Sequence, residues 1–135
     1  FFSQGPIFEE LKKRNNNSKI KFYSLVSKDD VQELYARSSI QIVPQLPNTS
    51  IGSLPSKLPN ILASGTKILV ITDENSELEQ LFIDNNFQKV ITTWNKQIIV
   101  SSIKELLAQD IALNKQKEIA QKLFNINSLI GKIVS

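Results

Sequence analysis

The residues best suited to chemistry lie between Ser53 and Gly65, a stretch that reads SLPSKLPNILASG. A proline cannot donate to the helical ladder, so Pro59 predicts a helix whose first turn starts near Ser56, with the serine hydroxyl as cap. A start at Pro59 itself is the alternative, because the residue before a proline disfavours helical geometry. Gly65 predicts the left-handed end of this helix. The unpaired N–H groups of a helix start attract anions, so this loop and helix could hold a phosphate.

Side chains three and four positions apart share one face of the predicted helix. The polar face consists of Lys57, Asn60 and Ser64. The apolar face, which we expect to pack on a sheet, consists of Leu58, Ile61 and Leu62. The polar residues also have plainer interpretations: Ser56 as a simple cap, Lys57 as an exposed helical lysine and Asn60 as a surface amide. A ligand site and an ordinary helix surface both fit the spacing.

Composition limits what this chain can do. Its 135 residues, with 41% hydrophobic and 21% charged, are typical of one soluble domain with a real core. There is no cysteine and no histidine, which excludes disulfides, thiol-rich metal sites and histidine-dependent catalysis within it. The net charge of +3 is modest and the charges are interspersed, so we expect no nucleic-acid partner. No apolar run is long enough to cross a membrane, and we expect a cytoplasmic protein.

Hydrophobic periodicity predicts strands that alternate with helices. The predicted strands are 1–4, 20–26, 40–44, 68–71 and 88–91. The predicted helices are 7–13, 27–37, 56–64, 77–85, 97–108, 111–123 and 127–134. Ser76 and Glu79 fit a capping box before the fourth of these helices. The alternation predicts an α/β fold, a Rossmann-like, doubly wound, mostly parallel sheet of about five to six strands flanked by helices.

We expect one domain over residues 1–135, and a segment of a longer protein, because the chain contains no methionine. In sheets of this kind ligands bind beyond the carboxyl ends of the strands. The loop 45–53 follows the predicted strand 40–44 and lies at such an end. It is long and rich in small and polar residues, which favours a functional loop over a simple connection.

Three blocks of the sequence resemble the C-terminal, donor-binding half of glycosyltransferase family 4, the retaining enzymes of GT-B architecture. The blocks are LYARSSIQIVP at 34–44, LPSKLPNILASGTKIL at 54–69 and SEL at 76–78. They look closest to bacterial exopolysaccharide members, including colanic-acid-type enzymes. The resemblance runs from about Gly5 to the C-terminus, and it implies that the chain is the C-terminal half of a GT-B fold.

By this resemblance the loop and helix start would hold the diphosphate of a nucleotide-sugar. Backbone N–H groups of Gly52 and Ser53 would reach the phosphates or the sugar, and Lys57 would add a positive charge. The turn at Val26 and Ser27 would flank the base. The implied donor-binding residues are Gly52, Ser53, Ser56, Lys57, Asn60, Val26 and Ser27. The resemblance implies no metal and no other cofactor.

Two positions depart from the family pattern. The family carboxylate that holds the ribose hydroxyls falls on Asn60, and its paired acidic position falls on Gly52. A carboxylate accepts charge-assisted hydrogen bonds from two hydroxyls, whereas an amide offers one neutral acceptor and two donors. We therefore expect weaker donor binding or altered ribose contacts.

The resemblance implies the donor-binding domain of a retaining glycosyltransferase of polysaccharide or glycolipid synthesis, using a UDP-, GDP- or similar nucleotide-sugar. A glycan or lipid-linked acceptor would bind a separate N-terminal half, so we expect no catalytic residue in this segment and no transfer by it alone. The full protein would be cytoplasmic or peripheral to the membrane. One alternative is a degenerate, non-catalytic relative that binds a nucleotide weakly or serves as an interaction module. Another is a different doubly wound nucleotide-binding domain, such as half of a sugar-nucleotide epimerase.

Overall fold

The computed structural model describes residues 1–49, 54–109 and 113–124, and its contacts divide the chain into two compact units. The first unit is Phe1–Val31, and the second begins at Gln32. The predicted helix at 127–134 lies outside the described residues. So do the predicted donor residues Gly52 and Ser53.

Aromatic side chains hold the first unit together. Its helix α1 spans Pro6–Arg14 and buries Phe8. The ring of Phe8 lies 5.6 Å from that of Phe22, which also stacks on Phe1 with 5.3 Å between the ring centroids. Aromatic pairs at these separations are favourable beyond the area they bury. The aromatic cluster therefore brings the amino-terminal residues against the segment that follows α1.

The two segments of the first unit that were predicted as strands are not strands in the structure. A single parallel bridge joins Phe2 to Tyr23, and the Tyr23 N–H donates to the carbonyl of Phe1 at 2.7 Å. Pairing stops there, and Ile20, Tyr23 and Leu25 stay exposed. The prediction for 20–26 was wrong because an alternating pattern makes a strand only where a partner pairs along its whole length.

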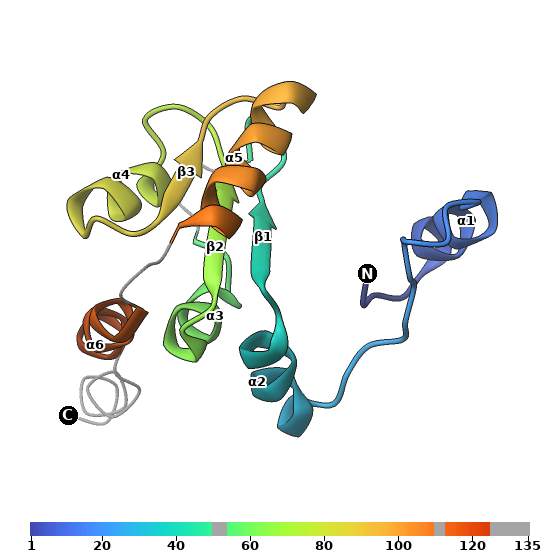
Figure 1. Cartoon of the computed structure of the whole chain (residues 1–135), viewed down its shortest axis with the longest axis horizontal. Coiled ribbons are helices and arrows are strands. Elements are labelled where there is room, and N and C mark those ends of the chain that lie inside the picture. Colours follow the sequence, from blue (N-terminus) through green and yellow to red (C-terminus); the bar gives the residue numbers. More distant parts are fainter. Residues whose placement is uncertain (50–53, 110–112, 125–135) are drawn as a thin grey trace. The chain divides into compact units, whose positions relative to one another are not determined.

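The second unit is an α/β domain with a parallel sheet. Helix α2 (Lys28–Arg37) spans the boundary between the two units in the sequence and leads into the second unit. The elements that follow are β1 (Ile40–Pro44), α3 (Leu58–Ser64), β2 (Lys67–Ile71), α4 (Glu77–Asp84), β3 (Lys89–Ile91), α5 (Lys96–Ala108) and α6 (Leu113–Leu123). The strands lie in the order β1-β2-β3, all parallel (Figure 1). The described residues thus contain three strands, whereas the sequence predicted five to six.

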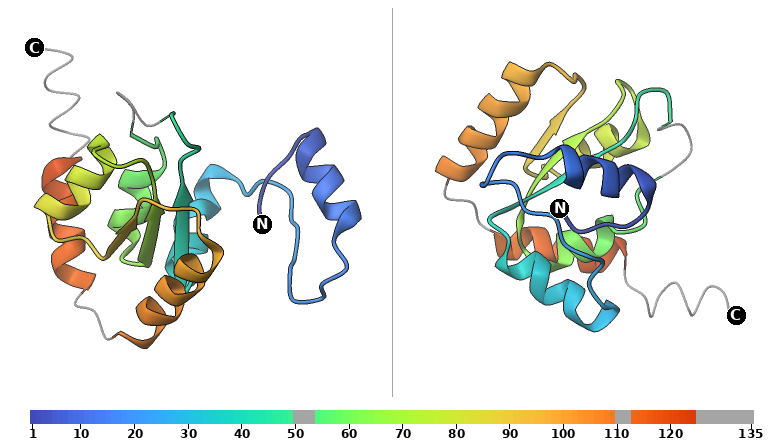
Figure 2. Two further views of the ribbon diagram at one scale, coloured as in Figure 1. Left: turned by 90° about the horizontal axis from the view of Figure 1, so that it is seen from above. Right: turned by 90° about the vertical axis from the view of Figure 1, so that its right-hand side faces the viewer.

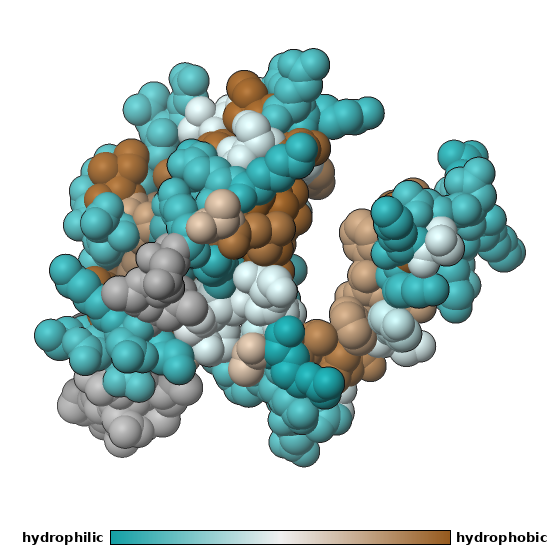
Figure 3. All heavy atoms as spheres, viewed as in Figure 1, coloured by the Kyte–Doolittle hydropathy of each residue, from teal (hydrophilic) through white to brown (hydrophobic). Residues whose placement is uncertain are grey.

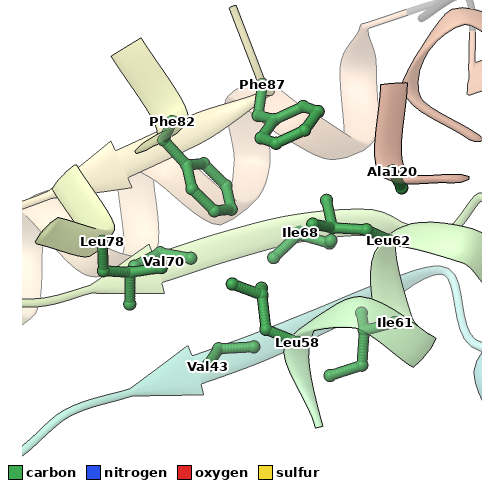
Figure 4. Close-up of a cluster of buried hydrophobic side chains, with 10 residues drawn as sticks. All are labelled: Val43, Leu58, Ile61, Leu62, Ile68, Val70, Leu78, Phe82, Phe87 and Ala120. Carbon is green, nitrogen blue, oxygen red and sulfur yellow. The ribbon is translucent and has the colours of Figure 1, made fainter. Parts of the chain in front are cut away.

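The central strand β2 is buried on both faces, which explains its unbroken apolar run. On one face Ile68 and Val70 pack into a cluster with side chains from α3, α4 and α6 (Figure 4). On the other face Leu69 and Ile71 pack against Leu106 of α5. Figure 2 shows α4 and α6 on one side of the strands and α5 on the other. The expected helices on both faces of the sheet are therefore present.

Strand β1 is an edge of this sheet and is less covered than β2. Its Val43 is buried against α3, but Ile42, on the opposite face, is 41% exposed. Val100 and Leu107 of α5 are also exposed, and apolar surface is visible beside α5 in Figure 3. Helix α5 thus covers β2 more completely than β1.

Candidate functional site

Helix α3 begins one residue later than a hydroxyl cap would require. Its N-cap is Lys57, whose backbone is helical, and no side chain caps it. A cap at Ser56 would bond the N–H of Leu58 or Pro59. The Leu58 N–H instead donates to the carbonyl of Pro55 at 3.1 Å, and Pro59 has no N–H. The predicted serine cap is therefore wrong, while Pro59 lies in the first turn as predicted.

The two faces of α3 separate as the sequence predicted. Leu58, Ile61 and Leu62 are buried, and Figure 4 shows Leu58 beside Val43, near the carboxyl end of β1. Lys57 and Asn60 are exposed on the solvent side of the same turn. At the far end Gly65 closes the helix with a φ of 74°, in the left-handed region that glycine adopts without strain. Three predicted donor residues, Ser56, Lys57 and Asn60, thus share one exposed turn.

Two further predicted donor residues, Val26 and Ser27, belong to the first unit, where Val26 is half-buried. The Ser27 hydroxyl donates to the Asp30 carboxylate at 2.7 Å, and the Asp30 N–H donates to the Ser27 carbonyl at 3.1 Å. Ser27 therefore directly precedes helix α2 and bonds to its first turn.

A buried polar chain at the carboxyl ends of β1 and β2 was not foreseen from the sequence. Thr72, the first residue after β2, is 2% exposed, and its hydroxyl donates to the side-chain oxygen of Gln45 at 2.6 Å. The hydroxyl oxygen of Thr72 also lies 3.0 Å from the Ser76 hydroxyl. A threonine hydroxyl has one proton, so Ser76 is the donor in the second contact. The sequence signal that could have found this cluster is a polar residue, Thr72, directly after the apolar run of β2.

The same cluster continues into the start of α4. The Ser76 hydroxyl accepts from the Glu79 N–H at 3.1 Å, which confirms the predicted helix cap. The Glu79 carboxylate accepts from the N–H of Asn75 at 2.5 Å, one residue before the position that a capping box prescribes. Two N–H groups at this helix start are thereby satisfied.

A second contact joins the loops that follow β1 and β2. The Asp73 carboxylate accepts from the backbone N–H of Asn48 at 2.9 Å. Asn48 has a φ of 66°, and asparagine tolerates this left-handed region better than most residues. Both loops leave the sheet at the same end because the strands are parallel, which explains how residues far apart in the sequence meet.

A pocket of about 210 Å³ lies at the opposite ends of the strands. Gln88 and Gln116, whose side chains bond to each other, are in its lining, as is Lys115 of α6. Ser56, Lys57 and Asn60, the predicted donor residues that the structure describes in this unit, do not line this pocket. They lie on the exposed turn of α3.

Among the residues that the structure describes, no group of acidic side chains is placed to hold a metal ion. No helix in that part of the chain is both long and apolar enough to cross a bilayer. Comparisons of the chain with models of protein families, with curated proteins and with solved structures find no match.

Proposed function

We propose that this chain is the donor-binding part of a retaining glycosyltransferase, and that it holds the diphosphate of a UDP-, GDP- or similar nucleotide-sugar against the start of α3. The observation that carries the proposal is the exposed pair Lys57 and Asn60 on one turn of that helix. A cation at the positive end of a helix suits a diphosphate. The negative charge would be stabilised as the sugar departs, an electrostatic contribution to catalysis.

The topology of the second unit supports the same place. Residues 45–49 and 72–76 follow parallel strands and lie at one end of the sheet, where ligands bind in open α/β folds. The three sequence blocks that resemble family 4 enzymes fall on the end of α2 with β1, on α3 with β2, and on the start of α4. The finer architecture, a doubly wound sheet of five to six strands in the C-terminal half of a GT-B fold, is part of this proposal. A separate half would bind the glycan or lipid-linked acceptor.

One observation favours a second candidate, a degenerate relative that binds a nucleotide without transferring sugar. Asn60 is an exposed amide at the position where family members have a carboxylate. An amide holds ribose hydroxyls without charge assistance, so donor affinity would be lower. Both candidates predict nucleotide binding at α3, and only the first predicts transfer when the acceptor-binding half is supplied.

The test is calorimetric titration of the full chain with UDP and with GDP. We expect Lys57→Ala to weaken binding by about 1 kcal/mol or more, the scale of a hydrogen bond to a charged group. Lys104→Ala is the matched control, because Lys104 is an exposed lysine on α5. Asn60→Glu should strengthen binding, since it restores a carboxylate acceptor. Equal affinity in wild type and Lys57→Ala would remove Lys57 from the site, and a wild-type chain that binds neither nucleotide would overturn the proposal.

A further inference from the structure

We infer that Thr72 and Asp73 are positioning residues, which hold the loop 45–49 in the conformation that donor binding requires. This inference rests on the proposed function, because that loop leads directly to the predicted donor residues. Neither Thr72 nor Asp73 belongs to the predicted donor set. Each makes a hydrogen bond to the loop, Thr72 to a side chain and Asp73 to the backbone.

The first contact fixes the beginning of the loop. The Gln45 N–H donates to the carbonyl of Ile71 at 2.8 Å, which extends the pairing of β1 with β2 by one residue. The Gln45 side chain then accepts from Thr72, whose hydroxyl is itself held by Ser76, the cap of α4. A hydrogen bond in this buried place is costly to leave unmade. Gln45 is therefore fixed through both its backbone and its side chain.

The second contact fixes the turn that follows. Thr49 closes this turn, with its N–H at 3.2 Å and its hydroxyl at 2.6 Å from the carbonyl of Leu46. Asn48 stands in the turn with its left-handed backbone, and its N–H points to the Asp73 carboxylate. A hydrogen bond to a charged acceptor is stronger than one between neutral groups. Asp73 therefore stabilises a backbone conformation that most residues disfavour.

The described residues 46–49 of this loop bury little of their surface. Leu46 is 69% exposed, and Asn48 and Thr49 are exposed as well. Segments with few buried apolar contacts open at low free-energy cost. The contacts from Thr72 and Asp73 therefore have a large share in setting the loop conformation, and their loss should affect the loop more than the core.

Matched substitutions separate this positioning role from a role in stability. Thr72→Val removes the hydroxyl and Thr72→Ser keeps it. Asp73→Ala removes the acceptor and Asp73→Asn keeps one oxygen. The control is Thr66→Val, because Thr66 is a buried threonine just before β2 whose hydroxyl donates to the carbonyl of Ser38 at 2.8 Å, at the other end of the strand. Each variant is compared with wild type in thermal melting, in UDP and GDP titration, and in amide hydrogen exchange at Asn48.

We expect Thr72→Val and Asp73→Ala to weaken nucleotide binding roughly threefold to thirtyfold, the range for a coupled position that does not touch the ligand. Thr72→Ser and Asp73→Asn should restore most of the affinity. Thr66→Val should lower the melting temperature and leave the affinity unchanged. Asp73→Ala should also speed exchange of the Asn48 amide.

Three results would overturn the inference: unchanged affinity in Thr72→Val and Asp73→Ala, an equal loss of affinity in Thr66→Val, or unchanged Asn48 exchange in Asp73→Ala. The proposed function fails in a different way, by the absence of nucleotide binding in the wild-type chain. The exchange measurement needs no nucleotide, so it reports on the Asp73 contact in either case.

Discussion

At the amino ends of the parallel strands polar side chains bond to one another and to the core backbone, whereas at the carboxyl ends they bond to loops. At the amino ends, Gln88 accepts from the N–H of Ile68 at 2.8 Å and donates to Gln116. Gln116, which is 6% exposed, donates to the carbonyls of Leu62 and Thr66 at 3.3 and 3.2 Å. These contacts attach α6 to the end of α3 and to the start of β2.

At the carboxyl ends the partners are of another kind. Thr72 and Asp73 bond to residues of a loop whose own side chains are largely exposed. The exposed turn with Lys57 belongs to the segment that connects β1 with β2. This end of the sheet therefore combines exposed side chains with loop residues held by hydrogen bonds, a combination that is common in binding sites.

The comparison teaches that one residue type can serve two purposes at the two ends of one strand. Thr66 and Thr72 flank β2, both are buried, and both hydroxyls donate hydrogen bonds. Thr66 bonds to the backbone just before β1, which is part of the frame of the sheet. Thr72 bonds to the first residue of a loop. Only the identity of the partner separates Thr66, which is structural, from Thr72, for which we infer a positioning role.

The largest expected effect on stability is at the amino ends of the strands, and it tests the comparison of the two ends. Gln116→Ala should lower the free energy of unfolding by about 3 kcal/mol, because it removes hydrogen bonds to two buried carbonyls and to the Gln88 amide. Urea denaturation measures this. Gln109→Ala, a change at an exposed glutamine that ends α5, is the control and should cost less than about 0.5 kcal/mol. Nucleotide affinity at the carboxyl ends should not change, and a loss there would break the comparison.

A smaller effect distinguishes two serines that precede helices. Ser76→Ala should cost about 1 kcal/mol of stability, because the Ser76 hydroxyl caps α4. Ser56→Ala should leave stability within about 0.5 kcal/mol of wild type, because Ser56 is exposed and caps nothing. Thermal unfolding of the two variants decides the matter. Equal costs would show that the predicted cap at Ser56 forms after all.

The smallest effect concerns the pH dependence of stability. Tyr35 packs against the core cluster shared by α3, α4 and α6, and burial raises the pKa of its phenol. The unfolded chain then loses this proton at a lower pH than the folded chain does. The contribution of Tyr35 is complete below about pH 10, the ordinary phenol pKa, and is lost as pH rises through the folded value.

Tyr35→Phe removes this dependence. We expect the stability of wild type to fall more steeply above about pH 10 than that of the variant, as measured by urea denaturation at several pH values. Parallel curves would show that Tyr35 ionises alike in the folded and unfolded chains. The other tyrosine, Tyr23, is exposed in the first unit, and Tyr23→Phe serves as the control.

Local patterns were enough to predict the elements around β2. The alternating and continuous apolar runs placed all three strands of the sheet, and the helices between them, within a few residues of their observed bounds. Gly65 and Ser76 were recognised as a helix end and a helix cap because each acts within about one helical turn of its own position. The apolar face of α3 followed from spacing alone.

Contacts between distant residues decided the rest. Residues 20–26 have the pattern of a strand but meet a partner at one bridge only. Thr72 meets Gln45 across 27 positions, and Gln88 meets Gln116 across 28. Such pairs leave no local pattern in a sequence, because the path of the chain through the parallel sheet, rather than the neighbouring residues, brings their side chains together.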